Sequence, residues 1–341
     1  MKSFSRGIIA LFIVSAILLF SDLQNRIVKK NTQQKILTKG VILKLAMVHY
    51  VDSPNSEDCE KGIRKALEDN LLKENADYTI KVFNAQGDMS TLNSIAGTIG
   101  NETWDLVFAT STPTMQILSN KLTSQEIVFT NVGEPIAAGL GKSFDDHLPN
   151  ICGVTTISDF DGLLNLALYL KPGMKSVGTV FSPAEVNSVI YKDRLADAAR
   201  KRGVELIAAP AGTTTEVLDA ANSLVAQRIE AFCQISDNLT GSSGSAIMKV
   251  SIDSKVPVFG FVTNQIKQGA VAVCARDYYQ AGYEAGRMGA EVLAGKNPAL
   301  IPFHCVSKTD YIINPEAAGL FRISIPDKLL TAFPDIKIFK Q

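Results

Sequence analysis

The sequence predicts an α/β protein made of two similar domains with parallel sheets and a cleft between them. Apolar, strand-like runs alternate with helix-like stretches, and this alternation runs twice, over about residues 41–150 and about residues 175–262. Each round opens with an apolar strand, a polar loop and a long amphipathic helix. Such alternation is typical of right-handed βαβ units, which form parallel sheets.

The expected strands are short apolar runs that end in polar residues, as buried parallel strands do. In chain order they are Lys44–Tyr50, Tyr78–Phe83, Leu106–Thr110, Ile127–Thr130, Ser176–Phe181, Val204–Ala208, Ala231–Ile235, Val256–Phe261 and Ala270–Cys274. We expect the chain after Val262 to return to the first domain and a further strand, Ser307–Ile313, to cross between the domains.

Helices are expected where apolar residues recur three or four positions apart. The main ones are Glu57–Leu71, Val186–Arg202, Thr215–Arg228 and Tyr278–Leu293, with another at Gly241–Asp253. Gly203 is a typical residue to follow a helix C-terminus, and Asp277 is a good N-cap for the helix after it.

The N-terminus predicts export. Lys2 and Arg6 precede Gly7–Phe20, which is apolar and free of charge. This length suits a signal-peptide core and is short for a membrane span. We expect residues 1–21 to be a cleaved signal peptide or an uncleaved signal-anchor, and residues 22–40 to be a linker. No Cys follows the apolar core, which argues against a lipid anchor.

The composition suits a globular protein of two domains. The chain has 341 residues, of which 46% are hydrophobic, and its 34 basic residues balance 34 acidic ones. This balance gives no reason to expect a nucleic-acid partner. The five Cys lack CxxC spacing and the three His are isolated, so we expect no metal site and no cofactor. The sequence does not decide whether any of the five Cys form a disulfide.

Five apolar runs end in polar loops, and parallel strands place such loops along one edge of a sheet, where open α/β sheets bind ligands. No GxGxxG, GxxxxGK[ST] or GxSxG motif is present. The loops therefore favour the binding of a small solute over catalysis.

Polar residues in these loops are candidates for binding the small solute. Ser111 and Thr112 offer hydroxyls beside the N–H groups of a helix N-terminus, which favour an anion. Asn187 and Ser188 occupy the matching position in the second round. Asp237 follows a buried strand directly and could accept hydrogen bonds from a ligand. Each of these residues could instead cap a helix.

Further candidates lie at other strand ends. Tyr50 and Phe261 could stack on a ligand or belong to the core. Ser53 and Ser182 end their apolar runs in polar loops. Glu134 lies in a Gly-Glu-Pro turn and could face either the cleft or a hinge between the domains.

Several runs carry a family resemblance. They are DLVFATSTPTMQ at 105–116, IVFTNVGEPIAAGL at 127–140, FSPAEVNS at 181–188 and DYYQAG at 277–282. In combination and order they resemble the ABC-transporter substrate-binding family that includes tryptophan-binding lipoproteins, over roughly residues 43–335. The chain departs from the family in lacking the lipoprotein Cys, and the loop Phe261–Asn264 lacks an acidic residue often found there.

The resemblance implies a type I periplasmic-binding-protein fold, with two Rossmann-like lobes joined by three crossing segments. We expect residues 41–154 plus 275–305 to form the N-terminal lobe and residues 155–274 plus 306–341 the C-terminal lobe.

The implied function is not enzymatic. The protein would bind a small solute, an amino acid or a related molecule, in the inter-lobe cleft and deliver it to the membrane subunits of an ABC permease. Its location would be periplasmic or otherwise extracytoplasmic, and it would contact the membrane only through an uncleaved leader. The alternative is a membrane-anchored ligand sensor of the same fold.

Overall fold

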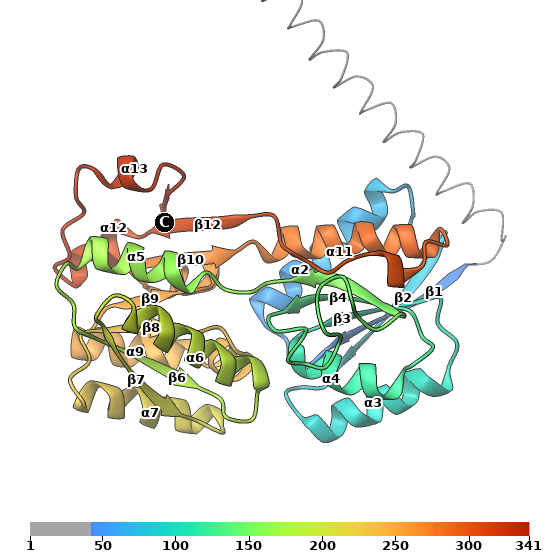
Figure 1. The fold of residues 1–341 in the computed structure, drawn as a ribbon, viewed down its shortest axis with the longest axis horizontal. Helices are drawn as coiled ribbons and strands as arrows, with labels where there is room; N and C mark the ends of the chain where they lie inside the picture. The colour runs from blue at the N-terminus through green and yellow to red at the C-terminus, as the bar shows by residue number, and fades with distance from the viewer. Residues whose placement is uncertain (1–41, 341) are drawn as a thin grey trace, which may run out of the picture.

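The computed structural model describes residues 42–340, which fold around two mostly parallel β-sheets (Figure 1). The predicted α/β class is confirmed. The leader and most of the linker lie outside the described residues. Within residues 42–340, none of the helices has the length and apolar character needed to cross a bilayer.

The first lobe, as we call it, is the six-stranded sheet with its helices, on the right of Figure 1. All its strands are parallel, in the order β11-β5-β4-β3-β1-β2. The strands are β1 (Leu43–His49), β2 (Tyr78–Asn84), β3 (Leu106–Thr110), β4 (Ile127–Val132), β5 (Ile151–Thr155) and β11 (His304–Cys305). The helices are α2 (Pro54–Asp69), α3 (Met89–Asn101), α4 (Thr112–Lys121), α11 (Tyr278–Leu293) and the 3₁₀ turn η1 (Pro298–Leu300).

The second lobe is the seven-stranded sheet with its helices, in the order β13-β12-β10-β9-β8-β6-β7, where only the β10–β12 pair is antiparallel. Its strands are β6 (Ser176–Phe181), β7 (Glu205–Pro210), β8 (Ala231–Gln234), β9 (Val258–Gly260), β10 (Ala272–Arg276), β12 (Thr309–Ile313) and β13 (Lys337–Ile338). Its helices are α5 (Phe160–Leu170), α6 (Val186–Arg200), α7 (Thr214–Ala226), α8 (Asn238–Ser242), α9 (Gly244–Ser254), α10 (Thr263–Gln268), α12 (Pro315–Leu320) and α13 (Leu329–Ala332).

Each sheet has a hydrophobic core on both faces. In the first lobe, α2 and α11 cover one face and α3 and α4 the other. In the second lobe, α5 and α6 cover one face, and α7 and α9 the other. Strands buried on both sides need apolar residues throughout, which is why β3 and β5 are fully buried along their lengths. All five cysteines are free. Cys152, Cys233 and Cys274 are buried in these cores, and Cys59 is buried in a small separate cluster with Val262 and Tyr278.

The chain passes between the two sheets three times: at 156–159 after β5, at Asp277 between β10 and α11, and at 306–308 between β11 and β12. The lobe bounds given above stay a prediction. In each sheet the carboxyl ends of the parallel strands lie at one edge, and residues that follow β1, β3 and β4 line one pocket together with residues that follow β6, β8 and β9.

The crossing segments are tied to one another. The Nε of Arg276 donates to the carbonyl oxygen of Ile157 at 2.6 Å, and its guanidinium also donates to Thr309. The backbone N–H of Asp277 donates to the carbonyl oxygen of Lys308 at 3.2 Å, and the two side chains form an ion pair. Arg276 therefore links all three connections between the lobes.

Three features differ from the sequence prediction. The return to the first domain expected after Val262 comes only at Asp277, because α10 packs on the second-lobe core and β10 pairs with β9 and β12 in the second sheet. The stretch Ile151–Thr155 forms β5, although Gly153 weakens its strand pattern. Glycine fits there because a Cβ would lie 2.5 Å from the backbone oxygen of Phe129 on the neighbouring strand. The helix predicted at Gly241–Asp253 is two helices, because the backbone leaves the helical conformation at Ser243.

Candidate functional site

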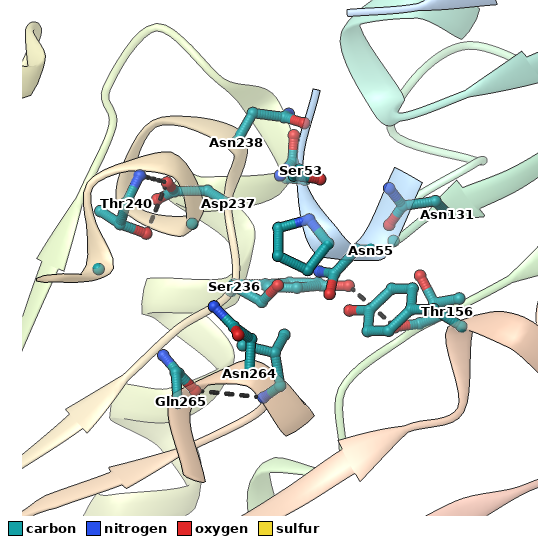
Figure 2. A pocket seen from close by; sticks show the side chains of 18 of the residues that line it. Ser53, Asn55, Asn131, Thr156, Ser236, Asp237, Asn238, Thr240, Asn264 and Gln265 are labelled. Atoms are coloured by element: carbon teal, nitrogen blue, oxygen red, sulfur yellow. Dashed lines mark hydrogen bonds between the residues drawn. The ribbon is translucent and has the colours of Figure 1, made fainter. Parts of the chain in front are cut away.

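A pocket lies between the two lobes, at the carboxyl ends of their strands (Figure 2). In Figure 2, Asn131 and Thr156 lie on one side of it, and Asp237 and Thr240 on the other. The space open to water molecules is about 50 Å³, so the two walls lie close together in this conformation. The lining residues are Ser53, Pro54, Asn55, Thr112, Asn131, Gly133, Thr156, Asn187, Tyr191, Ser236, Asp237, Asn238, Thr240, Gly241, Gly244, Val262, Asn264, Gln265, Gln268 and Tyr278.

The lining is rich in carboxamides and poor in charge. Asp237 is its single ionisable carboxylate, and no Lys, Arg or His of the described residues lines it. The carboxamides are Asn55, Asn131, Asn187, Asn238, Asn264, Gln265 and Gln268. Such a lining offers both donors and acceptors without a net cationic field, which suits a ligand of zero net charge.

Asp237 is buried in the second-lobe wall and holds two loops together. Its Oδ1 accepts from the N–H of Thr240 at 2.6 Å and from the Thr240 hydroxyl at 2.7 Å. Its Oδ2 accepts from the Ser188 hydroxyl at 2.6 Å and from the N–H of Ser182 at 3.3 Å. Burial raises the pKa of Asp237, and these hydrogen bonds oppose that rise. Asp237 is thus the N-cap of α8, and protein donors already occupy both of its oxygens.

Glu185, which sequence reasoning missed, lies behind the same wall. It is buried, and its carboxylate accepts from the N–H groups of Asn238 and Leu239 at the start of α8. Burial and the nearby charge of Asp237 raise the pKa of Glu185. In the sequence, Glu185 is an acidic residue just before a predicted helix. A residue at that position is usually expected to cap its own helix, so the contact of Glu185 with α8 could not be inferred.

Of the remaining second-lobe candidates, two hold Asp237 in place and one lines the pocket. Ser182 and Ser188 bind Asp237 and do not line the pocket. Asn187 lies in the first turn of α6, lines the pocket and is only 6% exposed. Its Oδ1 is buried and has no hydrogen-bond partner.

In the first-lobe wall, Ser53 lines the pocket and caps α2 through a reciprocal pair of bonds with Ser56. Thr112 also lines it, and its hydroxyl accepts from the N–H of Gly133 at 3.3 Å. Ser111 lies outside the lining; its hydroxyl pairs with that of Thr114 at 3.0 Å. The N-terminus of α4 therefore reaches the pocket without a side-chain cap.

Two further first-lobe candidates lie outside the lining. Glu134 forms an ion pair with Arg194 of α6 at 2.9 Å, which joins the two lobes away from the pocket lining. Burial raises the pKa of Glu134, and Arg194 opposes this. The hydroxyl of Tyr50 donates to the carbonyl oxygen of Gly87 at 2.6 Å, within its own lobe.

The aromatic residues of the pocket differ from those singled out in the sequence. Phe261 is buried in the second-lobe core, 5.1 Å from the ring of Phe160, and its neighbour Val262 reaches the pocket instead. Tyr191 and Tyr278 line the pocket. Tyr278 was visible in the sequence as the first residue of a helix beside a crossing segment, but nothing in the sequence placed Tyr191 there.

Comparisons with known proteins agree with this architecture. A family model described as ABC transporter substrate binding protein matches residues 44–336. A protein of Clostridioides difficile (strain R20291) named tyrosine-binding protein is 35% identical over 272 residues, which cover 80% of this chain and 79% of that protein.

Solved structures extend the likeness. A conserved domain protein from Vibrio cholerae superposes with a TM-score of 0.83 at 27% identity, covering 88% of this chain and 100% of that one. An ABC domain in complex with L-Trp from Streptococcus pneumonia superposes with a TM-score of 0.80 at 23% identity, covering 86% of this chain and 100% of that one. A third match is the ligand-free, open structure of a substrate binding protein with adhesive properties from Clostridium difficile. It superposes with a TM-score of 0.68 at 30% identity, covering 88% of this chain and 100% of that one.

Proposed function

Because this chain belongs to the ABC transporter substrate binding protein family, we propose that it binds a free aromatic amino acid, such as L-tyrosine, outside the cytoplasm and delivers it to an ABC permease. The observation that carries the proposal is the pocket between the lobes, whose lining comes from strand ends of both sheets. The ligand class is supported by the tyrosine-binding relative at 35% identity.

The two walls suit the two charges of an amino acid. The first-lobe wall supplies the hydroxyls of Ser53 and Thr112 and the uncapped N-terminus of α4, which favour a carboxylate. The second-lobe wall contains Asp237 with Glu185 behind it, which favour an ammonium group.

The apolar part of the ligand also has partners. Tyr191 and Tyr278 lie in the lining together with Pro54 and Val262. Aromatic rings pack well against such faces, in offset-stacked or edge-to-face arrangements. We therefore place the side chain of the ligand against these residues.

Delivery requires that the lobes open and close. This conformation resembles the L-Trp complex from Streptococcus pneumonia (TM-score 0.80, 23% identity) more than the ligand-free, open structure from Clostridium difficile (TM-score 0.68, 30% identity), although the latter is more similar in sequence. The narrow pocket agrees with a closed arrangement. We infer that the ligand enters when the lobes separate and is enclosed when they close.

Calorimetric titration of the purified protein tests the proposal. We expect L-tyrosine or another aromatic amino acid to bind with 1:1 stoichiometry, and L-glutamate and L-lysine to bind far more weakly because the lining offers no free counter-charge. A bound ligand should also raise the melting temperature, since it binds only the native state. If no amino acid binds, the proposed ligand class is wrong.

The import role needs a cellular readout. Cells that lack the protein should lose high-affinity uptake of the labelled ligand and regain it when the wild-type protein is restored. Undiminished uptake in the deletion strain would count against a transport role and favour the sensor alternative.

A further inference from the structure

We propose that Asn187 is the residue that accepts a hydrogen bond from the ammonium group of the bound amino acid. This inference rests on the proposed function and deepens it, because it assigns the ammonium site to a neutral side chain in place of Asp237. Asn187 would then fix the orientation of the ligand in the pocket.

The first observation is an acceptor without a partner. Among the buried side-chain oxygen and nitrogen atoms of residues 42–340 that lack a hydrogen bond, the Oδ1 of Asn187 is the one that belongs to a residue of the pocket lining. Buried polar atoms are nearly always paired, and an unpaired one destabilises the protein. A donor from a bound ligand would remove that penalty.

The second observation is that both carboxylate oxygens of Asp237 already accept hydrogen bonds from the protein. The N–H and hydroxyl of Thr240 and the hydroxyl of Ser188 donate to its two oxygens, and the N–H of Ser182, which donates to Ser188 at 2.8 Å, shares a longer bond of 3.3 Å with Asp237. A carboxylate has about four lone-pair positions, so a ligand ammonium could bind it directly only by displacing one of these donors. Displacement would release the N-cap of α8 or the link between the two loops.

The third observation is the charge around Asn187. It follows Glu185 by two residues, and its neighbour Ser188 donates to Asp237, so two buried acidic groups lie in this wall. No Lys, Arg or His of the described chain lines the pocket to offset them. Acidic groups with raised pKa values favour a positive charge beside them, and Asn187 supplies the open hydrogen-bond acceptor. The N-terminal partial charge of α6 is opposed by Glu185 at its N-cap position.

The test compares two ligands on two proteins. L-tyrosine carries the ammonium group, and 3-(4-hydroxyphenyl)propionate lacks it while keeping the ring and the carboxylate. Asn187→Leu removes the acceptor and nearly keeps the shape. We expect the variant to weaken L-tyrosine binding by about 10- to 100-fold, the usual effect of losing a hydrogen bond to a charged group. Its affinity for the propionate should change by less than about 3-fold.

Melting of the ligand-free proteins gives a second readout. Replacing an unpaired buried carbonyl with an apolar group should leave the melting temperature of Asn187→Leu unchanged or raised. Asn93→Leu, which removes a carboxamide bonded to its own helix α3 far from the lining, is the control and should bind both ligands like wild type. If Asn187→Leu does not fold, Asn187→Ala carries the same ligand comparison.

The outcomes separate the two proposals. An equal loss of affinity for both ligands, with a lowered melting temperature, would overturn the assignment and make Asn187 a structural residue. Wild-type affinity of the variant for L-tyrosine would also overturn it. If wild-type protein binds no amino acid at all, the proposed function fails first, and the ammonium site fails with it.

Discussion

Glu60 of α2 is an acidic residue whose ionised form is held by its neighbours. One carboxylate oxygen lies 3.3 Å from the Nε2 of the buried His49, and the other accepts from Arg64 at 2.7 Å. The hydrogen bond with His49 is the largest cause that lowers the pKa of Glu60, and Arg64 lowers it further against the effect of burial, to about 2. The ionised carboxylate therefore stabilises the fold.

We predict that Glu60→Gln lowers the free energy of unfolding near neutral pH, and that its difference from wild type shrinks under acid. The folded pKa is about 2 and the ordinary value is 4.5, so the contribution is complete above about pH 4.5 and is lost as the pH falls toward 2. Urea unfolding of both proteins between pH 7 and pH 3 measures this. Glu57→Gln, an exposed change in the same helix, is the control. A difference independent of pH would contradict the prediction.

Single residues also show where sequence reasoning about the site ends. Polar loops after strands were predictable, because buried parallel strands must end at a common polar edge. Which side chain faces the pocket was not, since a shift of one residue along a strand reverses the direction of its side chains. Strand β9 ends at Gly260, so Phe261 enters the core and Val262 lines the pocket. Asp237 could be read as a cap or as a ligand contact, and its donors became visible only once two distant loops were placed together.

At the scale of elements, the tightest contact in the first lobe is between α2 and α11. A Cβ on Gly62 would lie 2.1 Å from the carbonyl oxygen of Tyr279, and a Cβ on Gly282 would lie 2.1 Å from that of Cys59. The two helix backbones approach so closely that only glycine fits at either position. This contact sets the spacing of the two helices, whose N-terminal ends bring Ser53 and Tyr278 to the pocket.

We predict that Gly282→Ala destabilises the protein by at least about 1–3 kcal/mol. The new Cβ would clash with backbone atoms of Cys59, which cannot move away by a side-chain rotation. Gly97→Ala is the matched control. Gly97 lies within helix α3 with no atom within 4 Å of its Cβ position, so alanine should stabilise by roughly 0.5–1 kcal/mol. Chemical denaturation measures both. Equal effects of the two substitutions would show that the helices can separate at little cost.

Elements with strong periodicity were predictable, and elements defined by their neighbours were not. Helix α11 has the predicted bounds because Asp277 caps it and its apolar face repeats every three or four residues. Strand β5 contains a glycine and is recognisable only beside β4. The split of α8 from α9 comes at Ser243, where the backbone leaves the helical conformation, and the sequence pattern does not mark that residue.

At the scale of the whole molecule, the repeated alternation predicted two α/β units, but the connections between them had to come from resemblance or structure. The order of strands places β10 in the second sheet and α11 on the first, so the chain changes lobe at a single residue, Asp277. Such a short connection restricts how far the two lobes can move relative to each other. The bonds that Arg276 makes to Ile157 and Thr309 restrain the other two connections at the same place.

We predict that Arg276→Met loosens the placement of the lobes while each lobe stays folded. The substitution removes two hydrogen bonds that link the crossing segments, about 1–3 kcal/mol in total, without removing a core residue. Small-angle scattering should then show a larger radius of gyration for the ligand-free variant than for ligand-free wild type. Saturating L-tyrosine should bring both to the same smaller value, since the ligand selects the closed state.

The affinity of Arg276→Met should fall several-fold in the same samples, because a smaller share of the free protein is then ready to close. Arg202→Met is the control: Arg202 bonds Asp161 and Asn165 within the second lobe, so losing it should leave the radius of gyration and the affinity unchanged. If the Arg276 variant scatters like wild type in both states, the three connections fix the lobes without it. The restraint would then lie in the backbone of the crossing segments themselves.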